Sequence, residues 1–207
     1  MARFPPGAYG LRTMTEQQTF ELIQRFPDFE LRRYPAHLVA EVTVGSSFDR
    51  ATNRAFRQLF NYINGNNTAR QPLEMTAPVI QGFAPSQKVP MTAPVLQHAS
   101  LEEGEFVVAF VLPAGMTEET APIPADPEIR IGPVPAALAA VLGFSGIGSK
   151  SAFEKRNQEL QDAIAAAGLT AVGLPRFARY DPPFKPRFLR RNEVIQDVEE
   201  FPAGSGG

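Results

Sequence analysis

The sequence predicts an α+β fold made of two similar halves, each running strand, helix, strand, strand. Residues 35–40 align with residues 135–140, with proline, alanine and leucine at matched positions. Two glycines expected to end helices, Gly65 and Gly168, are 103 positions apart, close to the 100 positions that separate the two aligned segments. The 16 glycines and 20 prolines among 207 residues favour a loop-rich, strand-containing chain. We therefore expect two sheets that join around a pseudo-two-fold axis, with one helix on the outside of each half.

The first half contains an alternating pattern that changes to a helical one. Within residues 36–44, Leu38 and Ala40 share an apolar strand face, whereas His37 and Glu41 share the other. Beyond this strand, apolar residues recur every three or four positions, as in an amphipathic helix. The expected elements are strands over 29–33 and 36–44, a helix capped by Ser46 or Ser47 and ended by Gly65, and strands over 73–80 and 88–96.

The second half follows the same plan. Its helix starts near Ser149, carries an apolar stripe that includes Phe153 and Leu160, and ends at Gly168. The other expected elements are strands over 106–112, 128–131, 136–142, 176–180 and 188–195, with a proline-rich loop over 113–127. The predicted organisation is an N-terminal arm over 1–25, a single domain over 26–198 with pseudo-repeats at about 28–96 and 105–196, and a flexible tail over 199–207.

The residue types that the chain lacks exclude several classes of site. Without cysteine there is no disulfide framework, thiol nucleophile, cysteine-based zinc site or iron–sulfur cluster. With only His37 and His98, a three-histidine zinc site is also excluded. The formal charge of −2 argues against general attraction to nucleic acid or anionic membranes. Because the N-terminus has no apolar signal-peptide core, we expect a soluble cytoplasmic protein, either a monomer or a weak homo-oligomer.

Two features are candidate binding sites on residue chemistry alone. His37 reaches a ligand if its strand face lines a cleft between the halves, and is otherwise a solvated strand residue; His98 is expected in a surface loop. Residues 176–194 gather five arginines, one lysine and four aromatic residues. Such a segment suits an anionic, planar ligand, because cations pair with carboxylates while a ring stacks on the ligand face. The alternative is that Arg190 and Arg191 make ordinary ion pairs with nearby glutamates.

The pentapeptide Met-Thr-Ala-Pro-Val occurs twice, at residues 75–79 and 91–95. Methionine can ligate haem iron or line an apolar pocket. The simpler interpretation is structural, because proline ends or edges a strand and Met75 and Met91 then fill the core near the bend. Sequence patterns such as the nucleophile elbow and the Walker A loop are absent. The remaining catalytic alternative is an acid–base pair of Glu41, Glu74 or Glu193 with Tyr34, Tyr62 or Tyr180.

Three segments, taken in this order, resemble the SOUL haem-binding protein family. They are Phe-Glu-Leu-Arg-Arg-Tyr at 29–34, the doubled pentapeptide, and Ala-Arg-Tyr-Asp-Pro-Pro at 178–183 leading to Arg-Arg-Asn-Glu-Val at 190–194. The resemblance covers roughly residues 26–197. It implies a distorted eight-stranded β-barrel with two flanking helices, close to the drug-sensing domains of certain transcription regulators. It also implies non-covalent binding of haem or other tetrapyrroles without catalysis.

The same resemblance suggests residues that contact the ligand. Lys185, within the matching Pro-Pro-x-Lys-Pro, is expected to pair with a propionate. Where some family members carry a proposed axial histidine, this chain has Arg33. His37, four residues on, is an alternative iron ligand and shares the strand face of Arg33 by parity unless Pro35 disturbs the alternation. Binding without any histidine ligand is the preferred interpretation. Arg33 itself, Tyr62 and Arg179 complete the five expected contacts.

We therefore predict a protein, not an enzyme, that carries or buffers haem or porphyrin in a surface cleft. The alternative is binding or slow hydrolysis of amphipathic small molecules. A deep cleft with an inward glutamate beside a tyrosine would favour that alternative, whereas a shallow apolar groove rimmed by Lys185 and arginines would favour haem. A third hypothesis, a protein-interaction module, depends on the proline-rich loop over 113–127 alone.

Overall fold

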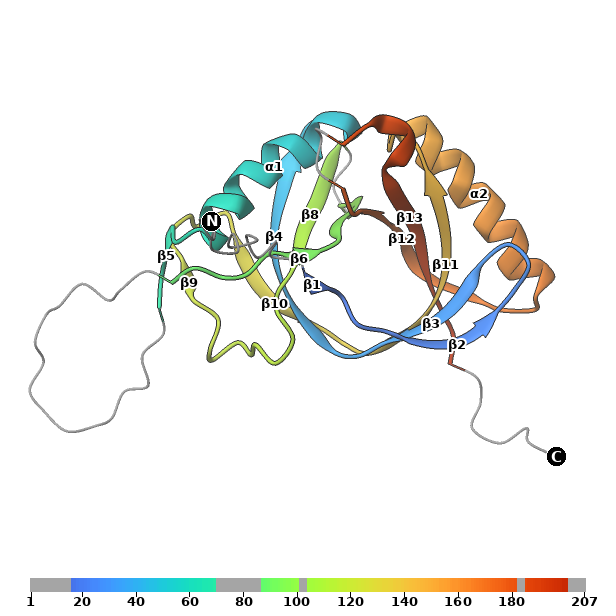
Figure 1. The fold of residues 1–207 in the computed structure, drawn as a ribbon, viewed down its shortest axis with the longest axis horizontal. Helices are drawn as coiled ribbons and strands as arrows, with labels where there is room; N and C mark the ends of the chain where they lie inside the picture. The colour runs from blue at the N-terminus through green and yellow to red at the C-terminus, as the bar shows by residue number, and fades with distance from the viewer. Residues whose placement is uncertain (1–15, 70–86, 101–103, 182–184, 201–207) are drawn as a thin grey trace, which may run out of the picture.

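The computed structural model describes residues 16–69, 87–100, 104–181 and 185–200. Its main feature is a nine-stranded antiparallel sheet that curls into a half-barrel, with two helices against one face (Figure 1). The strand order is β10-β4-β8-β7-β12-β13-β11-β3-β2. The predicted α+β class is confirmed, and the barrel is open because the sheet ends at two edge strands, β10 and β2.

The two predicted halves are present, and the first strand of each half pairs with a strand of the other half. The first half contains β3 (Glu30–Tyr34), β4 (His37–Gly45), α1 (Phe48–Ile63), β7 (Val95–Ala99) and β8 (Glu105–Val111). The second contains β10 (Arg130–Val134), β11 (Ala137–Ser145), α2 (Lys150–Ala166), β12 (Ala171–Arg179) and β13 (Arg191–Val198). Strands β7 and β12 pair at the centre, whereas β3 pairs with β11 and β10 pairs with β4. The order therefore reads the same from both ends through these eight strands, which confirms the duplication.

Among the described residues, five short strands lie outside this symmetric set. They are β1 (Glu16–Gln17), which pairs in parallel with β6 (Thr92–Ala93), β5 (Asn67–Thr68), which pairs with β9 (Ile123–Pro124), and the edge strand β2 (Glu21–Arg25). A single 3-10 turn, η1 (Arg187–Leu189), precedes β13. The first of these pairs matters for the site, because it holds the N-terminal segment across the sheet.

Both helices form where the apolar periodicity predicts them. The hydroxyl of Ser149 accepts a hydrogen bond from the Ala152 backbone N–H at 3.3 Å and so caps α2. Gly65 has a φ of 110° and Gly168 a φ of 71°, both in the left-handed region beyond a helix end. Glycine adopts this region without steric strain, which explains why each helix ends there.

Alternation along the strands divides the core between the two faces of the sheet. On the helix face, Leu38 and Ala40 of β4 pack with α1, while Leu138 and Ala140 of β11 pack with α2. The opposite face holds a third cluster drawn from both halves, and we call the space inside this face the lumen. Its buried members are Tyr34, Val39, Leu96, Ala109, Val111, Ala139, Val141, Ala178 and Ile195.

Several segment predictions need correction or lie outside the described residues. Residues 16–25, expected to belong to an arm, contain β1 and β2; the side chains of β2 are exposed throughout, so no apolar alternation marks this strand. His98 lies within β7 and not in a loop. The proline-rich loop over 113–127 contains β9. The expected strand over 73–80 lies outside the described residues, together with the first copy of the pentapeptide.

Candidate functional site

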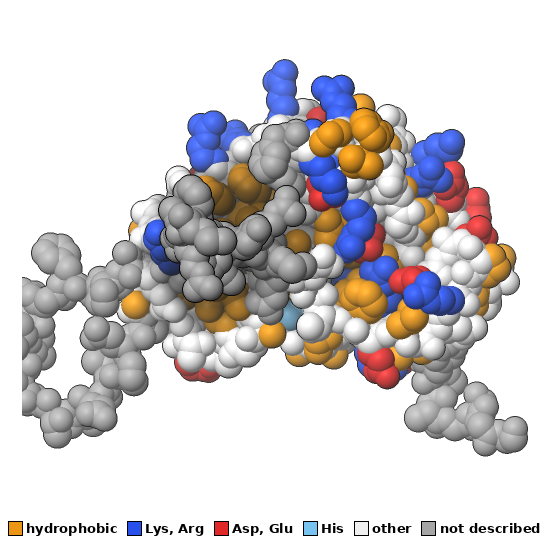
Figure 2. Space-filling view, in the orientation of Figure 1, with side chains coloured by type: hydrophobic (Ala, Val, Ile, Leu, Met, Phe, Trp, Pro, Cys, Tyr) orange, Lys and Arg blue, Asp and Glu red, His pale blue; other side chains and the backbone are white. Residues whose placement is uncertain are grey.

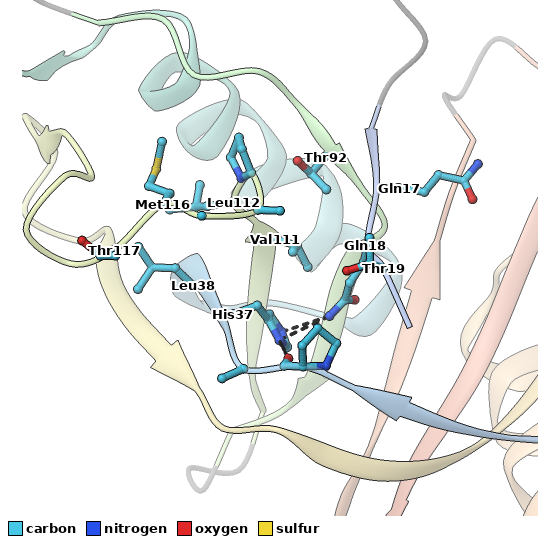
Figure 3. Close-up of a pocket in the computed structure, with 15 residues that line it drawn as sticks. Gln17, Gln18, Thr19, His37, Leu38, Thr92, Val111, Leu112, Met116 and Thr117 are labelled. Atoms are coloured by element: carbon cyan, nitrogen blue, oxygen red, sulfur yellow. Dashed lines mark hydrogen bonds between the residues drawn. The ribbon is translucent and has the colours of Figure 1, made fainter. Parts of the chain in front are cut away.

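The lumen contains a cavity of about 220 Å³ that residues of both halves line. A second cavity, of about 330 Å³, lies beside it and is lined by the N-terminal segment, the turn between β3 and β4, and the loop after β8 (Figure 3). The polar residues of the lumen cavity are Gln18, Tyr34, His37, Glu41, His98 and Arg176. Gln18 and His37 line both cavities.

His37 lies at the start of β4, at the boundary of the two cavities. Its Nδ1 donates to the carbonyl of Pro35 at 3.0 Å, so Nε2 accepts a hydrogen bond from the Gln18 side-chain amide at 3.1 Å (Figure 3). Burial lowers the pKa of His37 below its usual value, which keeps the ring neutral at neutral pH. Iron binding through Nε2 would therefore require that Gln18 be displaced.

The turn at Pro35 interrupts the alternation between β3 and β4. Arg33 shares its parity with Leu31, which packs in the core beneath α2. His37 shares its parity with Val39, which packs in the lumen. The expectation that Arg33 and His37 lie on one face is therefore wrong, because the turn shifts the phase by one residue. Arg33 instead makes a two-pronged ion pair with Glu200, at 2.9 and 3.0 Å.

The inner face also carries a buried polar network whose members are far apart in sequence. Glu193, 3% exposed, accepts hydrogen bonds from Arg32 Nη1 at 3.2 Å and from the Tyr180 hydroxyl at 2.5 Å. The Tyr34 hydroxyl accepts from the same Arg32 nitrogen at 3.3 Å. Burial and the neighbouring Glu193 charge raise the pKa of Tyr180, which therefore remains a protonated donor. Three members of the network, Tyr34, Tyr180 and Glu193, are candidates for acid–base chemistry from the sequence. The fourth member, Arg32, is not one of those candidates.

Arg179 lies between the N-terminal ends of the two helices. Its guanidinium carbon sits 5.3 Å and 4.9 Å from the ring centroids of Phe48 and Phe153. Its nitrogens donate to the side chains of Thr52 and Gln97 and to the Gly148 carbonyl. Burial lowers the pKa of Arg179 to about 10. Arg179 is half-buried, and these contacts join the two halves; its contact with a ligand remains a prediction.

Lys185 belongs to an exposed surface around η1. Its Nζ lies 2.6 Å from Asp181 Oδ1, and 37% of its side chain is exposed. Phe188 is 74% exposed, Leu189 53% and Ile147 51%. We call these three apolar residues, with Lys185 and the exposed Arg187, the η1 patch. Figure 2 shows exposed apolar side chains bordered by Lys and Arg side chains where Figure 1 places η1.

The five expected contact residues therefore lie in different surroundings. Lys185 is on the η1 patch, His37 is between two cavities, Arg33 is paired with Glu200, and Arg179 is half-buried against aromatic rings. The side chain of Tyr62, on α1, is fully buried in the core, and its hydroxyl donates to the Pro122 carbonyl at 3.0 Å; its contact with a ligand remains a prediction. Sequence reasoning missed the apolar members of the η1 patch, because Phe188 and Leu189 were expected in a strand.

Two absences hold for the described residues. No cluster of three or more histidine, aspartate or glutamate side chains there could hold a metal ion. Within the same residues, neither helix is both long and apolar enough to cross a bilayer.

Comparison with known proteins identifies relatives by sequence. The family model described as "SOUL heme-binding protein" matches residues 15–87 and 80–197 of the chain. The chain is also 25% identical over 167 residues to Heme-binding protein 1 of Xenopus laevis, in an alignment that covers 80% of this chain and 81% of the relative.

Solved structures share the fold at low sequence identity. The C-terminal domain of EcmrR has a TM-score of 0.56 at 13% identity, over 83% of this chain and 96% of that domain. A hydrolase from Listeria innocua has a TM-score of 0.54 at 11% identity, over 84% of this chain and 94% of the hydrolase. At such identities the likeness establishes the architecture alone: a curled antiparallel sheet with two helices.

Proposed function

The chain belongs to the SOUL haem-binding protein family, and from this premise we propose that it carries or buffers haem or a related porphyrin, bound non-covalently on the η1 patch. We further propose a cytoplasmic role, with which the absence of cysteine agrees. No chemical conversion of the ligand is part of this function. The family supplies the ligand class, and the η1 patch supplies the surface that suits it.

The observation that carries this proposal is the pairing of exposed apolar side chains with cations. Phe188 and Leu189 are 74% and 53% exposed, and large apolar surfaces rimmed by polar residues commonly mark binding sites. A porphyrin is a planar apolar ring with two propionates at one edge. The ring would cover Phe188 and Leu189, while Lys185 and Arg187 would pair with the propionates. Lys185 would then exchange its partner, because it is paired with Asp181 when no ligand is bound.

We propose further that the iron takes no histidine from the chain. His37 Nε2 is occupied by the Gln18 amide, and neither histidine belongs to the η1 patch. Apolar contact and ion pairing act equally on a porphyrin with or without iron. Hemin and metal-free protoporphyrin IX are therefore expected to bind with dissociation constants that agree within about threefold. Absorbance titrations with both ligands test the proposed function, and a porphyrin that fails to saturate the protein would overturn it.

His37→Ala is expected to leave the Soret maximum of bound hemin in place and its dissociation constant within about twofold of wild type. The physical reason is that removal of an imidazole that does not ligate iron leaves the iron coordination unchanged. His98→Ala serves as the matched control. A Soret shift confined to His37→Ala would show that His37 does ligate the iron and would contradict this part of the proposal.

Binding of an amphipathic small molecule is a second candidate function, favoured by the 220 Å³ cavity in the lumen. One glutamate and one tyrosine, Glu41 and Tyr34, line this cavity, whereas the hydrogen-bonded pair Glu193 and Tyr180 is not among its lining residues. Hydrolysis is not proposed, because Arg32 and Tyr180 occupy the carboxylate of Glu193 and leave it unsuited to act as a base or nucleophile.

A further inference from the structure

Gln18 and His37 lie between the cavity of 330 Å³ and the lumen cavity of 220 Å³, and both residues line both spaces. Their side chains are hydrogen-bonded at 3.1 Å, and Figure 3 shows the Gln18 side chain reaching toward the His37 ring. This contact acts as a partition between the two cavities.

The partition comes from a segment, residues 16–20, that spans both halves of the sheet. At one end, β1 pairs with β6, and the Gln18 backbone N–H donates to the Ala93 carbonyl at 2.8 Å. At the other end, the Phe20 ring centroid lies 4.2 Å from the Arg32 guanidinium carbon. The Gln18 side chain takes part in neither attachment. It can therefore be changed while the segment stays in place.

The chemistry of the larger cavity selects an uncharged ligand. No aspartate, glutamate, lysine or arginine is among its described lining residues, and His37 is neutral at neutral pH. An ionic group placed there would lose its hydration without gaining a counter-charge. The lumen cavity adds Glu41 and Arg176, but Arg176 is already ion-paired with Asp197, so an anion gains no free counter-charge there either. Leu38, Leu112 and Met116 supply apolar surface, while Thr117 and His37 are polar groups on the wall.

We propose that the two cavities form one binding site for an elongated amphipathic molecule that carries no negative charge, and that the Gln18 side chain limits the length of the molecule that enters. The larger cavity alone is near the lower end of the range of about 300–1,000 Å³ for small-molecule pockets, so joining the two admits a larger ligand. This inference deepens the second candidate function. It does not depend on haem binding at the η1 patch.

Two dyes that differ in one charged group test the proposal. N-phenyl-1-naphthylamine is uncharged, and 8-anilinonaphthalene-1-sulfonate is the same framework with a sulfonate. In fluorescence titrations, Gln18→Ala is expected to tighten binding of the uncharged dye at least about tenfold, because a second ring system gains apolar burial. The sulfonate dye is expected to change by less than about twofold, because its charge keeps it out.

Two further variants separate an open partition from a loosened segment. Gln18→Leu keeps the bulk of the side chain without the hydrogen bond and is expected to bind the uncharged dye as wild type does. Gln24→Ala, on the exposed edge strand β2, is the matched control. Equal affinities for the uncharged dye in wild type and Gln18→Ala would overturn the proposal, as would an equal gain in Gln18→Leu. Hemin titrations of the same variants distinguish the two proposals, because a failure of hemin to bind overturns only the haem function.

Discussion

Replacing Phe188 and Leu189 together by serine is expected to weaken hemin binding about ten- to a hundredfold. Both side chains are more than half exposed in the unliganded protein, so the substitutions remove little native packing. In the complex the porphyrin ring would cover them, and each is worth roughly 1.5–3 kcal/mol when fully buried. Soret absorbance titrations of the wild-type and variant proteins measure the difference.

Val172 and Leu174 provide a matched control for this variant, because they are 47% and 53% exposed but belong to β12 and not to the η1 patch. Val172→Ser with Leu174→Ser is expected to leave hemin affinity within about twofold of wild type. If the two double variants lost equal affinity, hemin would be binding to exposed apolar side chains in general. If neither lost affinity, the porphyrin would be bound elsewhere.

Arg32→Met is expected to reduce the free energy of unfolding by about 3–5 kcal/mol, the largest stability effect that we predict. The side chains of Arg32 and Glu193 are only 10% and 4% exposed and form an ion pair at 3.2 Å. Methionine fills much of the arginine volume but removes the nearer cation from the buried Glu193 carboxylate, which is left with Arg191 Nε at 3.9 Å. Urea unfolding followed by circular dichroism measures the loss.

Two other variants show whether this loss comes from the unpaired charge. Arg32→Met combined with Glu193→Leu removes both charges and is expected to recover most of the lost stability. Arg33→Met removes a neighbouring ion pair whose side chains are 42% and 57% exposed, and is expected to cost less than about 1 kcal/mol. Equal losses in Arg32→Met and Arg33→Met would contradict the role assigned to the buried pair.

The helices and long strands could be predicted because each carries a local periodicity. The stripe of α1 and the alternation of β4 follow directly from side chains that face one core. The exchange of β3 and β10 between halves has no such local signal, since the two strands would show the same alternation in either pairing. β2 was missed for a related reason, because an edge strand exposed along its length has no apolar face.

The site could be predicted only in part, because several of its contacts join residues that are distant in sequence. Lys185 is expected as a propionate partner from a short motif of the resembled family; the structure places it beside Asp181 with 37% of its side chain exposed, and its role in binding remains a prediction. Arg32 and Glu193 are 161 positions apart, and no pattern in either segment marks their pairing. The face that His37 occupies depends on a phase shift at Pro35, which strand parity does not show. Tyr62 lies on the apolar stripe of α1, a position typical of a core residue, and its side chain is fully buried.

The most direct test of the central proposal is to locate a bound porphyrin by backbone amide NMR. Gallium protoporphyrin IX is a diamagnetic analogue of haem, and its ring current shifts the resonances of nearby amides. We predict saturable binding with the largest shifts at Ile147, Phe188 and Leu189. The largest shifts at His37, Val39 and Leu96 would instead place the ligand in the lumen and contradict the proposed site, and the absence of saturable shifts would contradict porphyrin binding itself.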